Sequence, residues 1–169
     1  MNNSKISVII AVFNGADTLP SCINSVFSQI QDGIDLIVID GGSTDGSVDV
    51  IKSYSNKIAY WESAADEGIA HAWNKGIKRA QGEWLYFLGA DDVLQSPYVF
   101  QNVLKRLDAS QALVFYGNVT YFNNEGHTVM ESGGAWSPRV FRRYGMSFCH
   151  QAVFHHRSLF QEYGLFDMS

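Results

Sequence analysis

A run of β-branched and aliphatic residues near the N-terminus constrains the fold more than any other feature of the chain. Residues 6–13 read Ile-Ser-Val-Ile-Ile-Ala-Val-Phe and are nearly continuous in apolar character. A strand with one solvated face alternates polar and apolar residues, whereas a strand covered by helices on both faces does not. Residues 6–13 therefore predict a buried strand of a parallel sheet, which Asn14 and Gly15 end.

Strand-like and helix-like segments alternate along residues 1–92. Helices are expected at 19–30, 48–54 and 69–80, and further strands at 34–39, 58–61 and 83–88. Asp17 or Thr18 is the expected N-cap of the first helix, with Pro20 in its first turn. Alternation at this spacing is typical of right-handed βαβ units on one sheet. The first half predicts a Rossmann-like three-layer α/β/α sandwich.

The pattern changes after Asp92. A helix is expected at 99–107, strands at 112–122, 127–131 and 147–155, and a last helix at 157–163 that Gly164 ends. The sheet is therefore predicted to be mixed and mainly parallel. Residues 1–169 are expected to form one domain, with one half at 1–92 and another at 93–169. The abrupt end at 165–169 predicts a chain truncated at its C-terminus.

Composition excludes several classes of protein. In 169 residues, 46% hydrophobic and 14% aromatic content argue against disorder, and a formal charge of −5 argues against a nucleic-acid or anionic-membrane binder. Two cysteines, Cys22 and Cys149, supply neither a disulfide scaffold nor a zinc site. No apolar run approaches the roughly 18–20 residues of a membrane span, and no signal peptide precedes the first strand. We expect a soluble, acidic, intracellular domain.

Carboxylates follow several of the predicted strands. Asp40, Asp66 and the pair Asp91-Asp92 all come after apolar segments, as does Asn14. Ligands of open α/β sheets bind beyond the carboxyl ends of the strands. The pair Asp91-Asp92 suits Mg²⁺ or Mn²⁺, which bind through one or two carboxylates and substrate phosphates. An N-cap for the following helix is an equally good interpretation of the pair.

The other polar clusters admit a structural interpretation beside a functional one. Asp40 is placed to accept a hydrogen bond from a base or ribose, but the Gly-rich turn after it also fits a tight turn that uses glycine for positive φ. This turn has neither GxGxxG spacing nor a P-loop lysine. The third helix carries a polar stripe that is either solvated or turned toward a diphosphate: His71, Asn74, Lys75 and Lys78.

The histidines near the C-terminus favour a structural role. His155 and His156 are adjacent and point to opposite faces of a strand, so they do not share a metal ion. His150 beside an acid near the cleft is the functional alternative.

Four stretches, in this order and spacing, resemble the family 2 glycosyltransferases. They are Ser-Val-Ile-Ile-Ala-Val-Phe-Asn at 7–14, Leu-Ile-Val-Ile-Asp-Gly-Gly-Ser-Thr-Asp-Gly-Ser at 36–47, Asp-Glu-Gly-Ile at 66–69 with Trp-Asn-Lys-Gly at 73–76, and Leu-Tyr-Phe-Leu-Gly-Ala-Asp-Asp at 85–92. The resemblance implies a GT-A fold and transfer of a sugar, with inversion, from a nucleotide-sugar donor in a bacterial polysaccharide pathway. It implies a nucleotide-binding half at 1–92 and an acceptor-side half at 93–169.

The resemblance also implies roles for single residues. It places Asp40 on the nucleotide base, with Val12, Phe13 and Asn14 lining the same pocket. Further substrate contacts are implied for Asp66, Gly68, Asn74, Lys75 and Asp91. Asp92, with Asp91 beside it, is the implied ligand of Mn²⁺ or Mg²⁺. The family pattern is often D-x-D, and Gly89 at its first position leaves the metal geometry open.

The catalytic base implied by the family lies in an acidic motif after a stretch like residues 164–167, so it is expected beyond Ser169, and Asp167 is not nominated. The implied partners are a UDP-sugar and a saccharide or lipid-linked saccharide acceptor, without nucleic acid. The family implies a cytoplasmic location, with peripheral association at the inner face of the membrane. A non-catalytic or truncated nucleotide-sugar-binding domain is the alternative. A Rossmann oxidoreductase is rejected because no GxGxxG follows the first strand.

Overall fold

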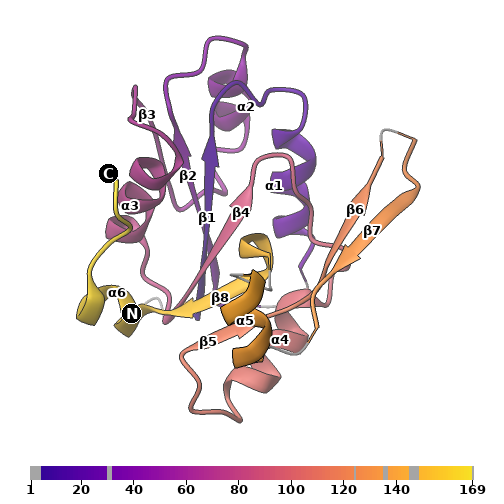
Figure 1. Ribbon diagram of the computed structural model, residues 1–169. Coiled ribbons are helices and arrows are strands. Elements are labelled where there is room, and N and C mark those ends of the chain that lie inside the picture. Colours follow the sequence, from indigo (N-terminus) through magenta and orange to yellow (C-terminus); the bar gives the residue numbers. More distant parts are fainter. Residues whose placement is uncertain (1–4, 30–31, 124, 135–136, 145–148, 169) are drawn as a thin grey trace.

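A six-stranded sheet with strand order β3-β2-β1-β4-β8-β5 forms the centre of the molecule (Figure 1). The computed structural model describes residues 5–29, 32–123, 125–134, 137–144 and 149–168. The sheet strands are β1 (Ile6–Val12), β2 (Ile34–Asp40), β3 (Tyr60–Ser63), β4 (Trp84–Gly89), β5 (Val114–Tyr116) and β8 (Val153–His156). A separate hairpin pairs β6 (Val119–Phe122) with β7 (Thr128–Ser132).

The sheet is mixed and mainly parallel, as the sequence predicts. Strands β1 to β4 run parallel, with Val8 of β1 opposite Leu36 of β2 on one side and Tyr86 of β4 on the other. Strand β8 is antiparallel to both β4 and β5. The helices are α1 (Leu19–Phe27), α2 (Ser47–Ser53), α3 (Ile69–Arg79), α4 (Val99–Leu107), α5 (Pro138–Tyr144) and α6 (Arg157–Tyr163), with a 3₁₀ turn η1 (His150–Ala152).

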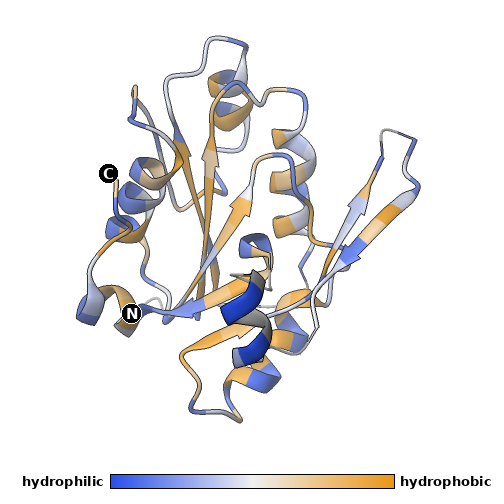
Figure 2. Cartoon of the chain, viewed as in Figure 1, coloured by the Kyte–Doolittle hydropathy of each residue, from blue (hydrophilic) through white to orange (hydrophobic). Residues whose placement is uncertain are grey.

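Helices cover both faces of the sheet, which explains the continuous apolar strands. Val8 and Ile10 of β1 belong to a core cluster with residues of α1, α2 and α4, whereas Ile9 belongs to a second cluster with residues of α3. Both faces of β1 are thus removed from water, which is the main stabilising contribution to such a fold. Figure 2 shows β1, β2 and β4 as largely hydrophobic.

One polar residue within this core ties the sheet to the α3–β4 loop. Ser7 is fully buried, and its hydroxyl donates to Asp35 Oδ1 at 2.8 Å. The Ser7 hydroxyl oxygen also accepts from the backbone N–H groups of Gly82 at 2.7 Å and Gln81 at 3.1 Å. The polar interruption of the first strand therefore satisfies backbone groups that burial would otherwise leave unpaired.

The second half differs from the sequence-based expectation at two predicted strands and at helix α5, which was not predicted. The strand expected at 112–122 is divided between β5, which pairs with β8, and β6, which pairs with β7 in the separate hairpin. The strand expected at 147–155 begins only at Val153, after η1, and residues 147 and 148 lie outside the described residues. Ile30 and Asn124 also lie outside them. Within the described part of the chain, every helix is too short or too polar to cross a bilayer.

Candidate functional site

The loops that follow β1, β2, β3 and β4 meet at one edge of the sheet, because these parallel strands all end there (Figure 1). Asn14 connects two of these loops: its N–H donates to Ser43 Oγ at 2.7 Å, and its Oδ1 accepts from Thr44 N at 2.9 Å. Asn14 has a φ of 52°, a left-handed conformation that asparagine tolerates better than most residues. Asn14 therefore holds the loop after β1 against the loop after β2.

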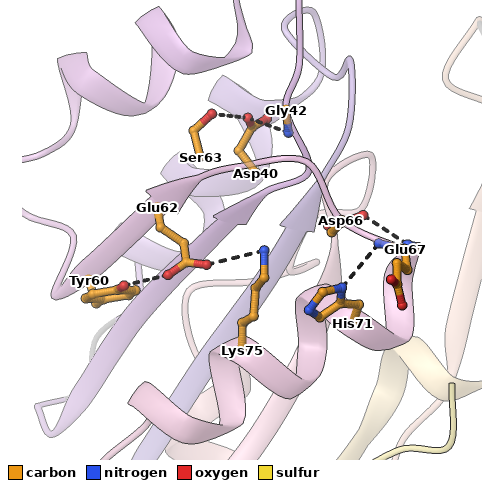
Figure 3. Close-up of polar contacts among 10 residues, drawn as sticks. Asp40, Gly42, Tyr60, Glu62, Ser63, Asp66, Glu67, His71 and Lys75 are labelled. Atoms are coloured by element: carbon orange, nitrogen blue, oxygen red, sulfur yellow. Dashed lines mark hydrogen bonds and ion pairs between the residues drawn. The ribbon is translucent and has the colours of Figure 1, made fainter.

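Asp40 is fully buried at the end of β2 and holds its own turn together. Its Oδ2 accepts from Gly42 N at 3.1 Å, Ser43 N at 3.0 Å and Ser63 Oγ at 2.6 Å (Figure 3). Gly42 has a φ of 88°, so the tight-turn interpretation of this segment is confirmed. Asp40 Oδ1 is buried and has no hydrogen-bond partner among the described residues.

Asp66 occupies space that a side chain at position 41 would fill. A Cβ on Gly41 would lie 2.9 Å from Asp66 Oδ2, and Asp66 Oδ1 accepts from Gly68 N at 3.0 Å. A hollow of about 340 Å³ opens here, lined by Ala11, Val12, Phe13, Gly41, Asp66, Gly68, Ile69 and Ala72. The structure thus brings together four of the predicted residues, Val12, Phe13, Asp66 and Gly68. It adds Gly41, whose only signal in the sequence is the Gly-Gly pair.

Lys75 and the neighbouring Asn74 already have partners within the chain. Lys75 Nζ lies 3.4 Å from Glu62 Oε1, and the Tyr60 hydroxyl donates to Glu62 Oε2 at 2.6 Å (Figure 3). The hydrogen bond from Tyr60, with the charge of Lys75, holds the pKa of Glu62 below its usual value. Sequence reasoning missed Glu62, which faces the polar stripe of α3 from β3.

Asn74 uses both ends of its amide on one backbone unit. Its Nδ2 donates to Phe166 O at 2.9 Å, and its Oδ1 accepts from Phe166 N at 2.9 Å. Asn74 is buried, so the pair holds the C-terminal segment against α3. We assign Asn74 to this contact and leave it out of the site proposed below.

We expect Asn74→Ala to loosen this segment while the sheet stays folded. Two hydrogen bonds are lost and two partly buried backbone groups of Phe166 are left without these partners, which costs about 1–3 kcal/mol. Amide exchange at Phe166 should accelerate, whereas Lys78→Ala on the exposed side of α3 should leave it unchanged. Unchanged exchange at Phe166 in Asn74→Ala would contradict the assignment.

The acid pair lies at the end of β4, where both carboxylates converge on one glycine. A Cβ on Gly89 would lie 2.6 Å from Asp92 Oδ2 and 2.8 Å from Asp91 Oδ1. The thiol of Cys22 in α1 donates to Gly89 O at 3.2 Å and holds this turn. Burial of Asp92, and then the charge of Asp91, raise the pKa of Asp92. The N-cap interpretation is wrong, because α4 begins only at Val99.

Two converging carboxylates that repel each other fit a hard divalent cation. Mg²⁺ and Mn²⁺ take oxygen ligands and often use only one or two protein carboxylates together with phosphate oxygens. Among the described residues, no group of three or more His, Cys, Asp or Glu side chains forms a complete protein cage. The pair therefore suits an ion that a diphosphate helps to hold.

The histidines pack within aromatic clusters. The ring of His150 stacks on Trp73 with centroids 4.6 Å apart, and His155 lies edge-on to Phe87 at 5.6 Å. Burial, with the charge of His150, lowers the pKa of His155 to about 4. His156 lies against Trp84, which belongs to the other core cluster, so the two adjacent histidines do face opposite sides. This geometry agrees with their structural interpretation.

Comparison with known proteins decides the family. The family model described as "Glycosyl transferase family 2" matches residues 7–160. The chain belongs to glycosyl transferase family 2. A "PGL/p-HBAD biosynthesis glycosyltransferase" of Mycobacterium tuberculosis is 32% identical to this family 2 chain over 168 residues, covering 96% of the chain and 63% of the relative. The chain thus spans about 63% of the length of this relative.

Solved structures show the same fold. The crystal structure of S. aureus TarS 1-349 in complex with UDP has a TM-score of 0.77 and 19% identity, covering 97% of the family 2 chain and 50% of that chain. The mannosyltransferase PcManGT from Pyrobaculum calidifontis, in complex with GDP-Man and Mn²⁺, has a TM-score of 0.72 and 21% identity, covering 99% and 48%. The family 2 chain has the GT-A fold that its sequence predicts.

Proposed function

We propose that this chain binds the donor of a glycosyltransferase that moves a sugar from a nucleoside diphosphate to an acceptor hydroxyl, with inversion and with the help of a divalent cation. One observation carries the proposal: the paired carboxylates at the end of β4 share a sheet edge with the hollow that Asp66 lines. The TarS complex with UDP and the PcManGT complex with GDP-Man and Mn²⁺ support it. A UDP-sugar is the donor that we expect.

The nucleoside end of the donor fits the hollow at the ends of β1 and β2. Val12 and Phe13 offer apolar surface to a base, and Phe13 is 68% exposed although it is aromatic. Asp66 offers a carboxylate to the polar edge of a base or ribose. Asp40 and Asn14, which the resemblance placed on the nucleotide, shape the loops that form this hollow. Lys75, paired with Glu62, remains a proposed contact of the diphosphate.

The diphosphate end of the donor lies toward the acid pair in this proposal. Asp92 and Asp91 would hold Mn²⁺ or Mg²⁺, which stabilises the negative charge that develops on the departing diphosphate. Deprotonation of Asp92 is costly without a cation, because Asp91 lies beside it and burial removes water. A bound cation would therefore offset both the repulsion between the two carboxylates and the loss of water around Asp92.

The proposed transfer is a single displacement. The acceptor oxygen forms a bond to the anomeric carbon, and the bond from that carbon to the diphosphate oxygen breaks. Its electron pair leaves with the nucleoside diphosphate, and the acceptor proton passes to a general base. None of the residues named above is assigned as that base.

Calorimetric titration with UDP, GDP and TDP, each in Mn²⁺ or in EDTA, tests the donor proposal. We expect UDP to bind most tightly and all binding to weaken in EDTA. Failure of all three nucleotides to bind in Mn²⁺ would contradict the proposal. Donor binding without sugar transfer by the full-length protein would favour the non-catalytic alternative.

Gly89→Ala should weaken Mn²⁺-dependent UDP binding while the fold stays intact. The added Cβ would fall on the side-chain oxygens of Asp91 and Asp92, which can rotate away, so the carboxylates lose their convergence. An outer-sphere change at a metal site costs about 10–100-fold in affinity, and we expect about tenfold here. Gly117→Ala, whose nearest neighbour would lie 4.0 Å away, is the matched control for calorimetry and thermal unfolding. Unchanged binding in Gly89→Ala would contradict the convergence argument.

A further inference from the structure

A second hollow, of about 470 Å³, opens beside the acid pair between α4, β5 and β6, and we call it the α4 groove. Asp91 and Asp92 are part of its wall. Most of its lining residues are apolar or aromatic, and they include Leu94, Val99, Val103, Phe115, Val119 and Phe122. None of the described residues lines both the α4 groove and the first hollow, which Asp66 lines and where we propose that the donor binds.

Helix α4 gives the groove its length. Val99, Val103 and Arg106 line it from one face of the helix, at positions i, i+4 and i+7. At a rise of 1.5 Å per residue these positions span about 10 Å. Arg106 is the one lining residue with a permanent positive charge. The groove therefore combines carboxylates from the end of β4 with a long apolar wall.

Phe122 extends the apolar surface to the edge of the groove. It is 52% exposed on β6, in the hairpin that projects from the body of the molecule (Figure 1). Val129 on the partner strand is 66% exposed and does not line the groove. An exposed phenylalanine at the mouth of a hollow is surface that an apolar ligand would cover.

We propose that the α4 groove binds the apolar portion of the acceptor, so that the acceptor is an alcohol or glycoside with an alkyl or aryl group about 10 Å long. This inference rests on the proposed function, which places the donor sugar at the acid pair. A ligand in the groove then has one end at the donor and the rest of its length against α4.

The lining selects this occupant over a nucleotide. Small-molecule sites are hollows of about 300–1,000 Å³ with mostly apolar walls and few polar groups that set orientation. Here the polar groups are the acid pair, Arg106 and a few neutral side chains, which include Gln95, Asn118 and Gln151. Apolar side chains outnumber these groups along the wall, so an alkyl chain gains free energy along its whole length there.

A series of methyl, butyl and octyl β-D-glucosides, each below its critical micelle concentration, tests the inference by calorimetry in the absence of nucleotide. We expect affinity to rise by up to about fourfold for each added methylene group, because each buried methylene contributes about 0.8 kcal/mol. No rise from methyl to octyl would overturn the inference. Sedimentation velocity of the same samples tests whether a second copy of the chain occupies the groove instead. Self-association that octyl glucoside does not reverse would also overturn the inference.

Two variants of the projecting hairpin locate the bound alkyl chain. Phe122→Ala should weaken octyl glucoside binding by about fivefold, because a bound alkyl chain would cover the exposed half of this side chain. Val129→Ala, which changes an exposed residue of β7 outside the groove, should leave binding unchanged. Equal effects of the two variants would overturn the assignment to the groove. Both residues are exposed, so neither change should unfold the protein.

Val103→Phe is the complementary variant, because it fills the groove instead of trimming it. We expect at least a tenfold loss of octyl glucoside binding with UDP binding in Mn²⁺ unchanged; retained octyl binding would overturn the inference. The two proposals fail separately. If UDP binds and the glucoside series does not, only the acceptor inference falls. If the series binds and UDP with Mn²⁺ does not, the proposed function falls and the acceptor assignment falls with it.

Discussion

Asp92→Asn is expected to remove the Mn²⁺-dependent part of UDP binding. Asparagine keeps the size of the side chain and removes the charge that the cation needs. Loss of an outer-sphere partner of a metal site costs about 10–100-fold in affinity, so loss of a direct ligand should cost at least about 100-fold. In calorimetry, the variant in Mn²⁺ should bind UDP no better than the unchanged protein in EDTA.

The same variant should stabilise the cation-free protein. The pKa of Asp92 is raised by burial and by the charge of Asp91, so its ionised form destabilises the fold at neutral pH. Neutralising it should raise the midpoint of thermal unfolding while donor binding falls. A damaged fold cannot produce these opposite changes together, which makes the pair of measurements diagnostic.

Asp49→Asn is the matched control for both measurements. Asp49 lies on the exposed side of α2 and pairs with Lys52 at 3.3 Å, in an exposed ion pair. Such pairs contribute little to stability, so neither UDP binding nor the unfolding midpoint should move. If Asp92→Asn retained the full difference between Mn²⁺ and EDTA, the assignment of the cation to this pair would be wrong.

The first half of the fold is predictable because burial leaves two patterns in its sequence: continuous apolar strands, and apolar residues at helical spacing. Strand β2, expected at 34–39 and found at Ile34–Asp40, is apolar almost throughout since helices cover both its faces. Helix α3 is expected at 69–80 and found at Ile69–Arg79, because its apolar side recurs at helical spacing. Where tertiary burial and local pattern agree, the sequence alone locates an element within a few residues.

The second half is less predictable because its strands are short and partly exposed. Residues 112–122 read as one strand, but Val114–Tyr116 pair with β8 whereas Val119–Phe122 pair with β7. The pairing with β8 depends on a segment more than thirty residues away. Pairing choices of this kind are set by long-range contacts, on which local alternation of residue types gives no information.

The site shows a different limit of sequence reasoning. The carboxylates at strand ends are visible in the sequence, but what their geometry requires of Gly41 and Gly89 is not. Both glycines leave space that carboxylates occupy: Asp66 beside Gly41, and Asp91 with Asp92 beside Gly89. Gly89 departs from the D-x-D pattern, and the structure gives a physical reason, since a Cβ there would displace the acids. A glycine in the sequence does not show which neighbouring side chain occupies the space beside it.

The half-buried histidine pair of His150 and His155 is expected to make folding stability depend on pH. The pKa of His155 lies at about 4 in the folded protein, well below its ordinary value of 6.5, because burial and the charge of His150 oppose its protonation. Between these two pKa values the unfolded chain binds a proton that the folded chain does not. Stability is therefore fully present above about pH 6.5 and is lost as the pH falls toward 4.

Urea unfolding at pH 7 and pH 5 measures this loss. At 1.36 kcal/mol for each pH unit, His155 should account for about 2 kcal/mol over this interval. His155→Phe should abolish that part, because phenylalanine fits among Phe87, Phe160 and His150 without a proton to bind. His127→Gln, an exposed histidine of the hairpin, is the control and should leave the pH dependence unchanged.

The difference between His155→Phe and the unchanged protein isolates the effect from the other titrating groups. Burial also lowers the pKa of His150, so part of the dependence persists in the variant. Asp92 acts with the opposite sign: its raised pKa means that the folded chain takes up a proton first, which adds stability as the pH falls. Because both contributions are common to the two proteins, they cancel in the difference. An identical loss of stability from pH 7 to pH 5 in the two proteins would show that His155 is not held neutral by the aromatic cluster.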